Sequence, residues 1–375
     1  MAYSIARNNF DLIRLIAALQ VAVLHVLYYL TPQWGNAPPF QFLSWFPGVP
    51  IFFFISGFLI SRSYEKTADT VEYARNRALR IFPALHVCVL LNLVMVWATG
   101  YFSDVQASFL DILLLYLGKT TILQFYNPEF MRQFGDGVLN GSLWTICVEL
   151  QFYVLTPFLY KLLLQGRRLS PNVVLITCIA VSIICNRLLY SLQPEFHESN
   201  LWKLARVSFL PWIYMFLTGA LVQRNFQTIS KLIRPNLFVP CMLAYSAYAW
   251  LLYRNGFAFN NSISPLLFFP LAAVTLVAAY SGPDIARRLL KGHDFSYGIY
   301  VYHIPFMNMF LYYGLQGKIS YVASVIVVTI VTAIASWFLI ERPSLRHKRR
   351  ATHPINDPVQ VSSEMDVRST SDAPK

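Results

Sequence analysis

One apolar stretch near the N-terminus, residues 11–30, constrains the fold of this chain more than any other feature. It is long enough to cross a bilayer as a helix, because about 20 apolar residues span the hydrocarbon core. It nevertheless carries Asp11, Arg14 and His25, and an ionisable side chain in hydrocarbon costs several kcal/mol unless it finds a partner. A chain with this segment must therefore bury polar partners between membrane helices.

The three ionisable residues of this segment lie on one helix face. At about 100° per residue, the steps from Asp11 to Arg14 and from Arg14 to His25 return to nearly the same side of the helix. With a rise of ~1.5 Å per residue, Arg14 and His25 are roughly 16 Å apart along the axis. We interpret them as the two ends of one buried path, with Arg14 near the membrane surface and His25 deep inside.

The composition indicates a membrane protein. Of 375 residues, 56% are hydrophobic and only 13% are charged, and the mean hydropathy is +0.47. The net charge of +12 does not indicate nucleic-acid binding, because the basic residues form short clusters between apolar runs, as topology signals do. The five cysteines lie inside apolar segments without metal-ligand spacing, which predicts neither a metal site nor a redox role.

Ten segments are apolar and long enough to cross a bilayer, which predicts an all-α polytopic membrane protein. An eleventh apolar run, residues 109–125, has a short core that Lys119 interrupts. If this run does not cross, every basic cluster faces the cytoplasm, as the positive-inside rule requires. We therefore predict a re-entrant or interfacial segment there. The ten predicted spans are residues 11–30, 45–61, 79–98, 142–164, 173–190, 204–222, 237–253, 263–280, 295–313 and 320–340.

The chain is predicted to have one membrane domain and a short tail. Residues 1–341 form the membrane domain, whose first apolar run lacks a clear cleavage site and is read as a retained span. Residues 342–375 are polar and basic, and are expected to be disordered. The predicted topology places both termini in the cytoplasm, for a multi-pass protein of the cytoplasmic (inner) membrane.

Glu149 is the candidate partner of His25. In the predicted topology, His25 lies roughly 8 Å below the outer end of its span, and Glu149 roughly 10 Å below that of residues 142–164. A histidine and a carboxylate in a dry site form a general base and its orienting partner. Alone, each residue has a structural interpretation, as a hydrogen-bonded core histidine or as a contact between helices. Their matched depth favours the catalytic interpretation.

Arg77 and Arg80 are candidate anion-binding residues. They stand one helical turn apart where the third predicted span leaves the cytoplasm, so their guanidinium groups can converge near Arg14. Paired arginines suit phosphate, because each offers bidentate donors and stays charged. Positive-inside anchoring is the alternative explanation for both residues. Arg14 lies within the first turn of a span, where Asp11 could neutralise or orient it.

Four further residues are supporting or cavity-lining candidates. His303 and Tyr300 lie in a span that Pro305 interrupts, and a helix loosened by proline beside polar side chains often lines a cavity. Trp144 belongs to the aromatic surroundings of Glu149. Ser56 precedes a glycine in an aromatic-rich helix, where small residues allow close approach of another helix or a ligand. Structural packing is the alternative role for each.

Six segments together resemble the acyltransferase 3 family of integral membrane acyltransferases. Two details depart from the family pattern: Thr145 stands where serine is commoner, and IFFFISG replaces LFFVLSG. Neither removes a chemical group on which the predictions depend. The segments are FDLIR (10–14), GVPIFFFISGFLI (48–60), RALR (77–80), SLWTICVELQFY (142–153), FSYGIYVYHIPF (295–306) and ERP (341–343).

The resemblance implies transfer of an acyl group, usually acetyl, from cytoplasmic acetyl-CoA across the membrane to a hydroxyl of a surface or exported glycan. It implies that His25 is catalytic and that Arg14, Arg77 and Arg80 lie near the donor. Acyl-CoA, a glycan acceptor and membrane lipid are the expected partners, with no bound cofactor. The chain lacks the extracytoplasmic esterase-like domain of some relatives, so its membrane domain and outer loops, or a partner, would recognise the acceptor.

A transporter of lipid-linked sugars or small solutes is the alternative function. In that case Asp11, His25, Glu149 and His303 would form a proton relay. A transporter has no obvious use for the two cytoplasmic arginines, and it would need no acyl-CoA. The sequence leaves open the acceptor, the acylated position, the length of the acyl group, the choice between direct transfer and an acyl-enzyme, and the oligomeric state.

Overall fold

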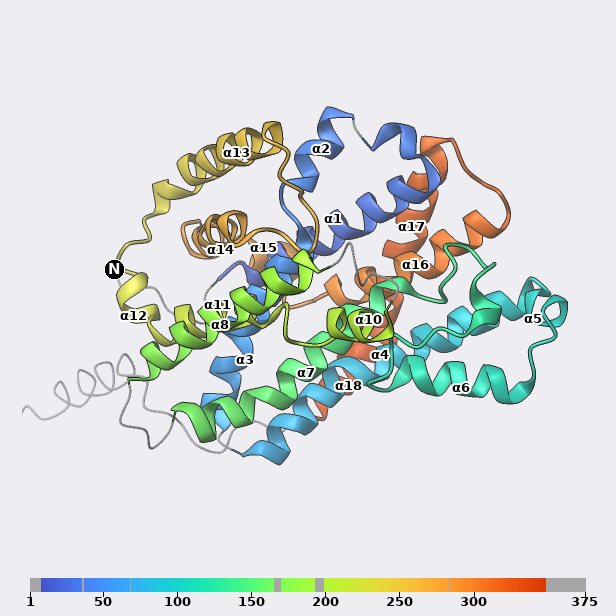
Figure 1. Cartoon of the computed structure of the whole chain (residues 1–375), viewed down its shortest axis with the longest axis horizontal. Helices are drawn as coiled ribbons and strands as arrows, with labels where there is room; N and C mark the ends of the chain where they lie inside the picture. The colour runs from blue at the N-terminus through green and yellow to red at the C-terminus, as the bar shows by residue number, and fades with distance from the viewer. Residues whose placement is uncertain are drawn as a thin grey trace, which may run out of the picture.

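The computed structural model describes residues 8–35, 37–67, 69–164, 170–192, 199–282 and 284–348 (Figure 1). Within these ranges the chain is helical, without a strand, which confirms the predicted all-α class. Most of the predicted cytoplasmic tail lies outside the described residues. Its first residues do not: Arg342–Arg346 forms a further helical turn, α18, directly after the last long helix.

The helices follow one another with short connections, and several are interrupted by 3₁₀ or π turns. The longer α-helices are α1 (Phe10–Leu30), α3 (Gly48–Thr67), α4 (Thr70–Ala98), α6 (Phe109–Thr120), α7 (Trp144–Phe158), α8 (Pro171–Ser191), α11 (Ile213–Arg224), α13 (Phe238–Arg254), α14 (Pro265–Tyr280), α16 (Ser296–Tyr312) and α17 (Ile319–Ser336). The short ones are α2 (Pro38–Ser44), α5 (Tyr101–Asp104), α10 (Asn200–Arg206), α12 (Phe226–Ile229), α15 (Ile285–Leu290) and α18 (Arg342–Arg346). The interrupting turns are η1 (Pro32–Trp34), η2 (Glu129–Met131), η3 (Gly141–Leu143), η4 (Leu159–Leu164), η5 (Pro235–Leu237) and η6 (Trp337–Glu341).

Nine of the ten predicted spans correspond to one main helix each. The predicted span 204–222 does not: it covers the end of α10, a non-helical stretch at residues 207–212 and most of α11. Judged by length and composition alone, 6 helices among the described residues are long and apolar enough to cross a membrane. The main helices of the other predicted spans are α11, α13, α14 and α16, which are shorter, with 12 to 17 residues. The six are Phe10–Leu30, Pro38–Thr67, Thr70–Ala98, Gly141–Lys161, Pro171–Ser191 and Ile319–Arg346.

Helix α6 is too short to cross a bilayer. It has 12 residues, or roughly 18 Å at ~1.5 Å per residue, against a hydrocarbon core of about 30 Å. Ser108 and Asp111 form a capping box that starts the helix. Its exposed face is apolar and includes Leu110, Leu114 and Leu117, so this face suits lipid. This length agrees with the prediction of a re-entrant or interfacial segment for residues 109–125.

Helix α16 is the most enclosed helix around the candidate site. It packs against both α1 and α17, on the right of Figure 1, and most of its side chains are buried, Tyr300 and His303 among them. Pro305 lies within the helix without ending it. Because α1 runs along α16, the polar face of α1 meets the buried face of α16. This packing determines which side chains can become partners of Arg14 and His25.

Two glycines bring α3 and α11 into backbone contact. A Cβ atom at Gly57 would lie 1.9 Å from the carbonyl oxygen of Phe216, and one at Gly219 would lie 2.1 Å from that of Phe54. Both distances are far inside van der Waals contact, so only glycine fits at either position. Gly57 follows Ser56, and the predicted close approach of another helix is confirmed there. This contact holds Ser56 beside the candidate site.

Gly57→Ala is expected to destabilise the protein strongly. The added methyl group has to push α3 and α11 apart, and overpacking of this kind costs about 3 kcal/mol at the upper end of its range. Unfolding of the purified protein in detergent micelles measures the effect. Gly282→Ala is the matched control, because a Cβ atom there meets nothing within 4 Å. Equal stability of the two variants would contradict the proposed helix contact.

Candidate active site

A cationic cavity of about 310 Å³ lies between α1, α3, α4 and α7. Arg14 enters it from α1, and Arg77 and Arg80 enter it from α4, so the predicted convergence of the three arginines is confirmed. We call this space the arginine cavity. Its lining residues are Arg14, Ile55, Ser56, Leu59, Ile60, Arg77, Arg80, Glu149, Tyr153, Asp294, Trp337, Leu345 and Lys348.

Asp294 is the counter-ion of two of the arginines. Its carboxylate pairs with Arg14 at 3.0 Å and also with Arg80, which in turn lies 3.7 Å from Glu341. Burial alone would raise the pKa of Asp294, but the guanidinium groups of Arg80 and Arg14 outweigh it and hold that pKa below its usual range. Asp11 forms no ion pair with Arg14 among the described residues: Arg14 pairs with Asp294 instead, although the charges of Asp11 and Arg14 still interact.

Arg77 has no ion-pair partner among the described residues. One of its terminal nitrogens donates to the hydroxyl of Ser63 at 3.2 Å, while its buried Nε has no partner. The guanidinium lies over the rings of Tyr73 and Tyr153, at 5.9 and 5.7 Å. Aromatic faces thus stabilise the cation while leaving donors available. Arg77 is the arginine best placed to receive an anion that enters the cavity.

Lys348 adds a fourth cation to the cavity, one that the sequence reasoning missed. Burial, and then the charges of Arg77, Arg80 and Arg14, lower the pKa of Lys348 to about 8. Its only sequence signal is the basic run at residues 346–350, which the topology prediction counts as a cytoplasmic cluster. Asp294 was also missed, although it directly precedes the FSYGIYVYHIPF segment.

Glu149 lies in the arginine cavity and does not contact His25. Its carboxylate accepts hydrogen bonds from Tyr153 at 2.6 Å and from Ser56 at 3.3 Å. The predicted pair of His25 and Glu149 is therefore wrong. In the structure Glu149 lines the arginine cavity together with Arg14, so α7 brings Glu149 to the cations and not to His25.

The partner of His25 is His303. The Nδ1 atom of His25 lies 3.0 Å from Nε2 of His303, and the two rings stack with centroids 5.3 Å apart. On the other side of its ring, Nδ1 of His303 lies 3.3 Å from the carbonyl oxygen of Ile299. His303 is fully buried. The helices α1 and α16 thus join two intramembrane histidines that are 278 residues apart in the sequence.

This hydrogen-bond chain assigns the tautomers of both neutral histidines. A carbonyl oxygen only accepts, so Nδ1 of His303 carries the hydrogen that points at Ile299. Nε2 of His303 is then an acceptor, and Nδ1 of His25 must donate to it. The lone pair of His25 is left on Nε2. This atom can serve as a general base or a nucleophile.

Helix α7 carries side chains from the arginine cavity towards the histidines. A narrow cavity of about 40 Å³ shares Arg14 and Glu149 with the arginine cavity and extends to Thr145 and Tyr300. The hydroxyl groups of Thr145 and Tyr300 lie 2.7 Å apart, and the ring of Tyr300 is 6.0 Å from that of His303. The narrow cavity thus leads from the cations to the neighbourhood of the histidine pair.

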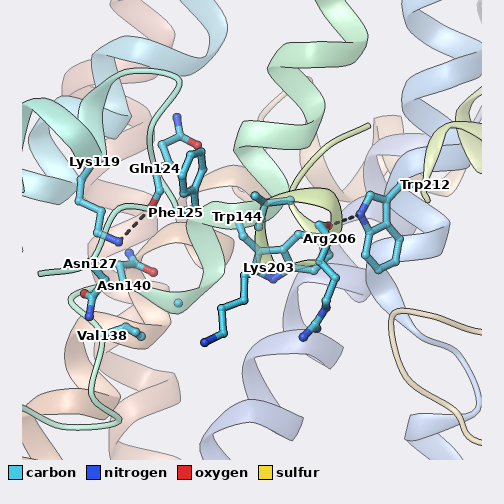
Figure 2. A pocket seen from close by; sticks show the side chains of 12 residues that line it. Lys119, Gln124, Phe125, Asn127, Val138, Asn140, Trp144, Lys203, Arg206 and Trp212 are labelled. Atoms are coloured by element: carbon cyan, nitrogen blue, oxygen red, sulfur yellow. Dashed lines mark hydrogen bonds between the residues drawn. The ribbon is translucent and has the colours of Figure 1, made fainter. Parts of the chain in front are cut away.

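A third space, the tryptophan pocket, lies at the start of α7 (Figure 2). Its volume is about 260 Å³. Trp144, the first residue of α7, forms part of its wall. The pocket is lined by Lys119, Gln124, Phe125, Asn127, Val138, Asn140, Gly141, Trp144, Lys203, Arg206, Val207 and Trp212.

Comparison with known families identifies the class of enzyme. The model of the acyltransferase domain family matches residues 7–341, nearly the whole of the described chain. The chain belongs to the acyltransferase 3 family. This confirms the resemblance drawn from the sequence segments, and it establishes this protein as a membrane acyltransferase rather than a transporter.

Three relatives of this acyltransferase illustrate its similarity. Nodulation protein 10 of Rhizobium leguminosarum bv. viciae is 30% identical, over 91% of this chain and 94% of the relative. An O-acetyl transferase of Shigella phage Sf6 is 26% identical, over 89% and 95%. O-acetyltransferase OatA of Staphylococcus aureus (strain NCTC 8325 / PS 47) is 24% identical. The match covers 85% of this acyltransferase but only 54% of the staphylococcal protein. No solved structure matches significantly.

Proposed function

We propose that this acyltransferase moves an acetyl group from cytoplasmic acetyl-CoA to a hydroxyl of a surface or exported glycan. The names of the phage and staphylococcal relatives support O-acetyl transfer. The observation that carries the proposal is the series of spaces along α7, with cations at one end and the His25–His303 pair beside the other. The basic clusters support a place in the cytoplasmic membrane, with both termini in the cytoplasm.

The arginine cavity would bind the phosphates of the donor. Arg77 and Lys348 lack ion-pair partners among the described residues and offer the available charges. Arg14 and Arg80 are held in place by Asp294 and would add hydrogen bonds from fixed positions. With the phosphates held there, the pantetheine arm extends along α7 and brings the thioester towards the histidines.

His25 would activate the acceptor. As the acceptor hydroxyl oxygen attacks the thioester carbonyl carbon, Nε2 of His25 takes the hydroxyl proton. Collapse of the tetrahedral intermediate forms the ester and breaks the carbon–sulfur bond, and the departing thiolate receives the proton. In the covalent alternative, the same Nε2 atom attacks the thioester first and carries the acetyl group. His303 acts through His25, as a positioning residue.

Donor use is expected to fall as the pH rises through about 8. Lys348 is protonated below its pKa of about 8 and loses its charge above it, while the arginines stay charged. The value of kcat/KM for acetyl-CoA should therefore decrease above that pH. Lys348→Met should lower kcat/KM about tenfold at pH 7, equivalent to one charge-assisted hydrogen bond, and remove the decrease. Arg346→Met, an exposed cation on the same segment, is the control.

The proposal is tested by following a labelled acetyl group from acetyl-CoA to the glycan. Inside-out membrane vesicles that contain the protein and its glycan acceptor receive acetyl-CoA with a labelled acetyl group. We expect label in the glycan as an alkali-labile ester, and unlabelled free CoA outside the vesicles. Uptake of intact acetyl-CoA or of free sugar without ester formation would overturn the proposal. Vesicles without the protein provide the background.

A further inference from the structure

Pro305 removes a hydrogen bond from α16 next to His303. In an α-helix, each backbone N–H donates to the carbonyl oxygen four residues earlier, and proline has no N–H. The carbonyl group that loses its donor in this way is that of Val301, and His303 lies midway between Val301 and Pro305. All three residues are buried, and a buried backbone carbonyl normally has a hydrogen-bond donor. The turn that carries His303 therefore needs a donor from outside its own helix.

Two side chains from other parts of the chain donate to the carbonyl oxygen of Val301. The amide nitrogen of Asn140 lies 2.9 Å from it, and the thiol of Cys88, on α4, lies 3.3 Å from it. Both side chains are buried. A thiol is a weak donor, so the amide is the principal one. Asn140, 161 residues away in the sequence, thus replaces the hydrogen bond that the proline removes.

The side chain of Asn140 is fixed in the orientation that this hydrogen bond requires. Its amide oxygen accepts from the backbone N–H of Ser142 at 3.2 Å and from the hydroxyl of Ser142 at 2.7 Å, and so caps η3. Because the oxygen faces a backbone N–H, the amide nitrogen has to face Val301. The neighbouring carbonyl oxygen, that of Leu139, accepts from Asn92 of α4 at 2.6 Å. Asn140 is therefore a preorganised donor.

The segment before η3 also holds α16 on the other side of His303. Asn308, five residues after His303, is fully buried. Its amide nitrogen donates to the carbonyl oxygen of Val138 at 2.8 Å, and its amide oxygen accepts from the backbone N–H of Asp136 at 3.0 Å. The same segment thus contacts α16 at Asn308 and, through Asn140, near the other end of the turn that carries His303.

The position of this turn decides whether the two histidines can pair. Nε2 of His303 accepts from Nδ1–H of His25 at 3.0 Å, and a hydrogen bond weakens steeply when its geometry is lost. A shift of the backbone between Val301 and Pro305 would move Nε2 of His303 relative to α1. Asn140 opposes such a shift, because it holds the carbonyl of Val301 from outside the helix.

We propose that Asn140 is a positioning residue for the histidine pair: its amide replaces the donor that Pro305 removes and so holds the turn of α16 that carries His303. This inference rests on the proposed function, because it adds a residue to the same reaction. Asn140 lines the tryptophan pocket (Figure 2) and is absent from the described residues that line the arginine cavity. Its effect is therefore on the chemical step and not on donor binding.

Three variants test the inference through the kinetics of acetyl transfer. Asn140→Ser still offers an oxygen that caps η3 but is too short to donate to Val301, and should lower kcat about tenfold with KM for acetyl-CoA unchanged. Pro305→Ala returns the backbone N–H that donates to Val301 within the helix, and should remain close to the wild type. The double variant should recover most of the kcat that Asn140→Ser loses, because the missing donor is restored.

Asn186→Ser is the matched control. Asn186 is also a fully buried asparagine, and its amide nitrogen donates to the carbonyl oxygen of Pro211 at 2.8 Å. It belongs to α8, which packs mainly against α11. The control removes a similar hydrogen bond and a similar volume, so it should lower stability by a similar amount and leave kcat of the folded protein unchanged.

A measurement without turnover separates this inference from the proposed function. In ¹⁵N NMR spectra of histidine-labelled protein in detergent, the signals of the pair are identified by their change in His303→Gln. We expect them to shift in Asn140→Ser and to return in the double variant. Absence of acetyl transfer to glycan by the wild type would refute the proposed function, whereas these shifts report the positioning of the histidines alone.

Three results would overturn the inference. One is a double variant that stays as slow as Asn140→Ser, because the carbonyl of Val301 would then not be the group that matters. Another is an equal loss of kcat in Asn186→Ser, which would indicate general destabilisation. The third is an unchanged set of histidine signals in Asn140→Ser. If Asn140→Ser fails to fold, recovery of folded protein in the double variant supports the inference, and failure to recover contradicts it.

Discussion

His25→Ala is expected to lower acetyl transfer by about 10³-fold, because general-base catalysis by a positioned side chain contributes about 10² to 10⁴. His25 presents the lone pair of Nε2, and His303 is the residue that keeps it there. The assay measures labelled acetate transferred from acetyl-CoA to glycan by membranes with equal amounts of each variant. Donor binding, which depends on the arginine cavity, should be unchanged. Transfer at the wild-type rate would refute the assignment of His25.

Two substitutions of His303 separate positioning from packing. His303→Leu removes the acceptor that holds the Nδ1–H of His25, so kcat should fall about 10²-fold with little change in KM for acetyl-CoA. His303→Gln retains a side-chain oxygen that can accept this hydrogen bond and should recover much of the loss. A merely structural role predicts no such recovery by the polar variant. Equal activity of the leucine and glutamine variants would show that the hydrogen bond is unimportant.

Asp294→Ala is expected to reduce the free energy of unfolding by about 3 kcal/mol or more. The change leaves Arg14 and Arg80 without their shared carboxylate in a site where Asp294 is only 11% exposed, and breaking a buried ion pair costs about 3–5 kcal/mol. The pKa of Asp294 is held below its usual range. The carboxylate of Asp294 therefore makes its full contribution to the stability of the wild-type protein at neutral pH, and this contribution is lost only as the pH falls through the lowered pKa. Denaturant or thermal unfolding in detergent measures the difference.

A control and a double variant make this prediction specific. Asp104→Ala removes an exposed carboxylate and should change stability by less than about 0.5 kcal/mol. Adding Arg14→Met to Asp294→Ala removes the arginine whose one ion pair among the described residues is with Asp294, and should restore part of the stability. If Asp294→Ala is as stable as Asp104→Ala, the carboxylate is not the counter-ion that holds the two arginines.

The sequence by itself determined the helices and the candidate polar residues. An apolar run in a bilayer has to satisfy its backbone hydrogen bonds internally, so residues 11–30 could only form a helix. Helical geometry then placed Arg14 and His25 on one face, and the close spacing of Arg77 and Arg80 predicted their convergence. Each of these properties depends on residues near one another in the chain. The resemblance to the family was likewise carried by short, ordered segments.

Only the tertiary structure decided the partners. Asp294 pairs with Arg14 across 280 positions of the sequence, and His303 pairs with His25 across 278. Such pairs depend on the register and depth at which α16 packs against α1. The hydrophobic pattern of the sequence determines neither the register nor the depth. Glu149 illustrates this: its position along its own segment was known from the sequence, but not which side chains of other helices it meets. Local spacing therefore predicts which side chains share a face, whereas helix packing determines what they touch.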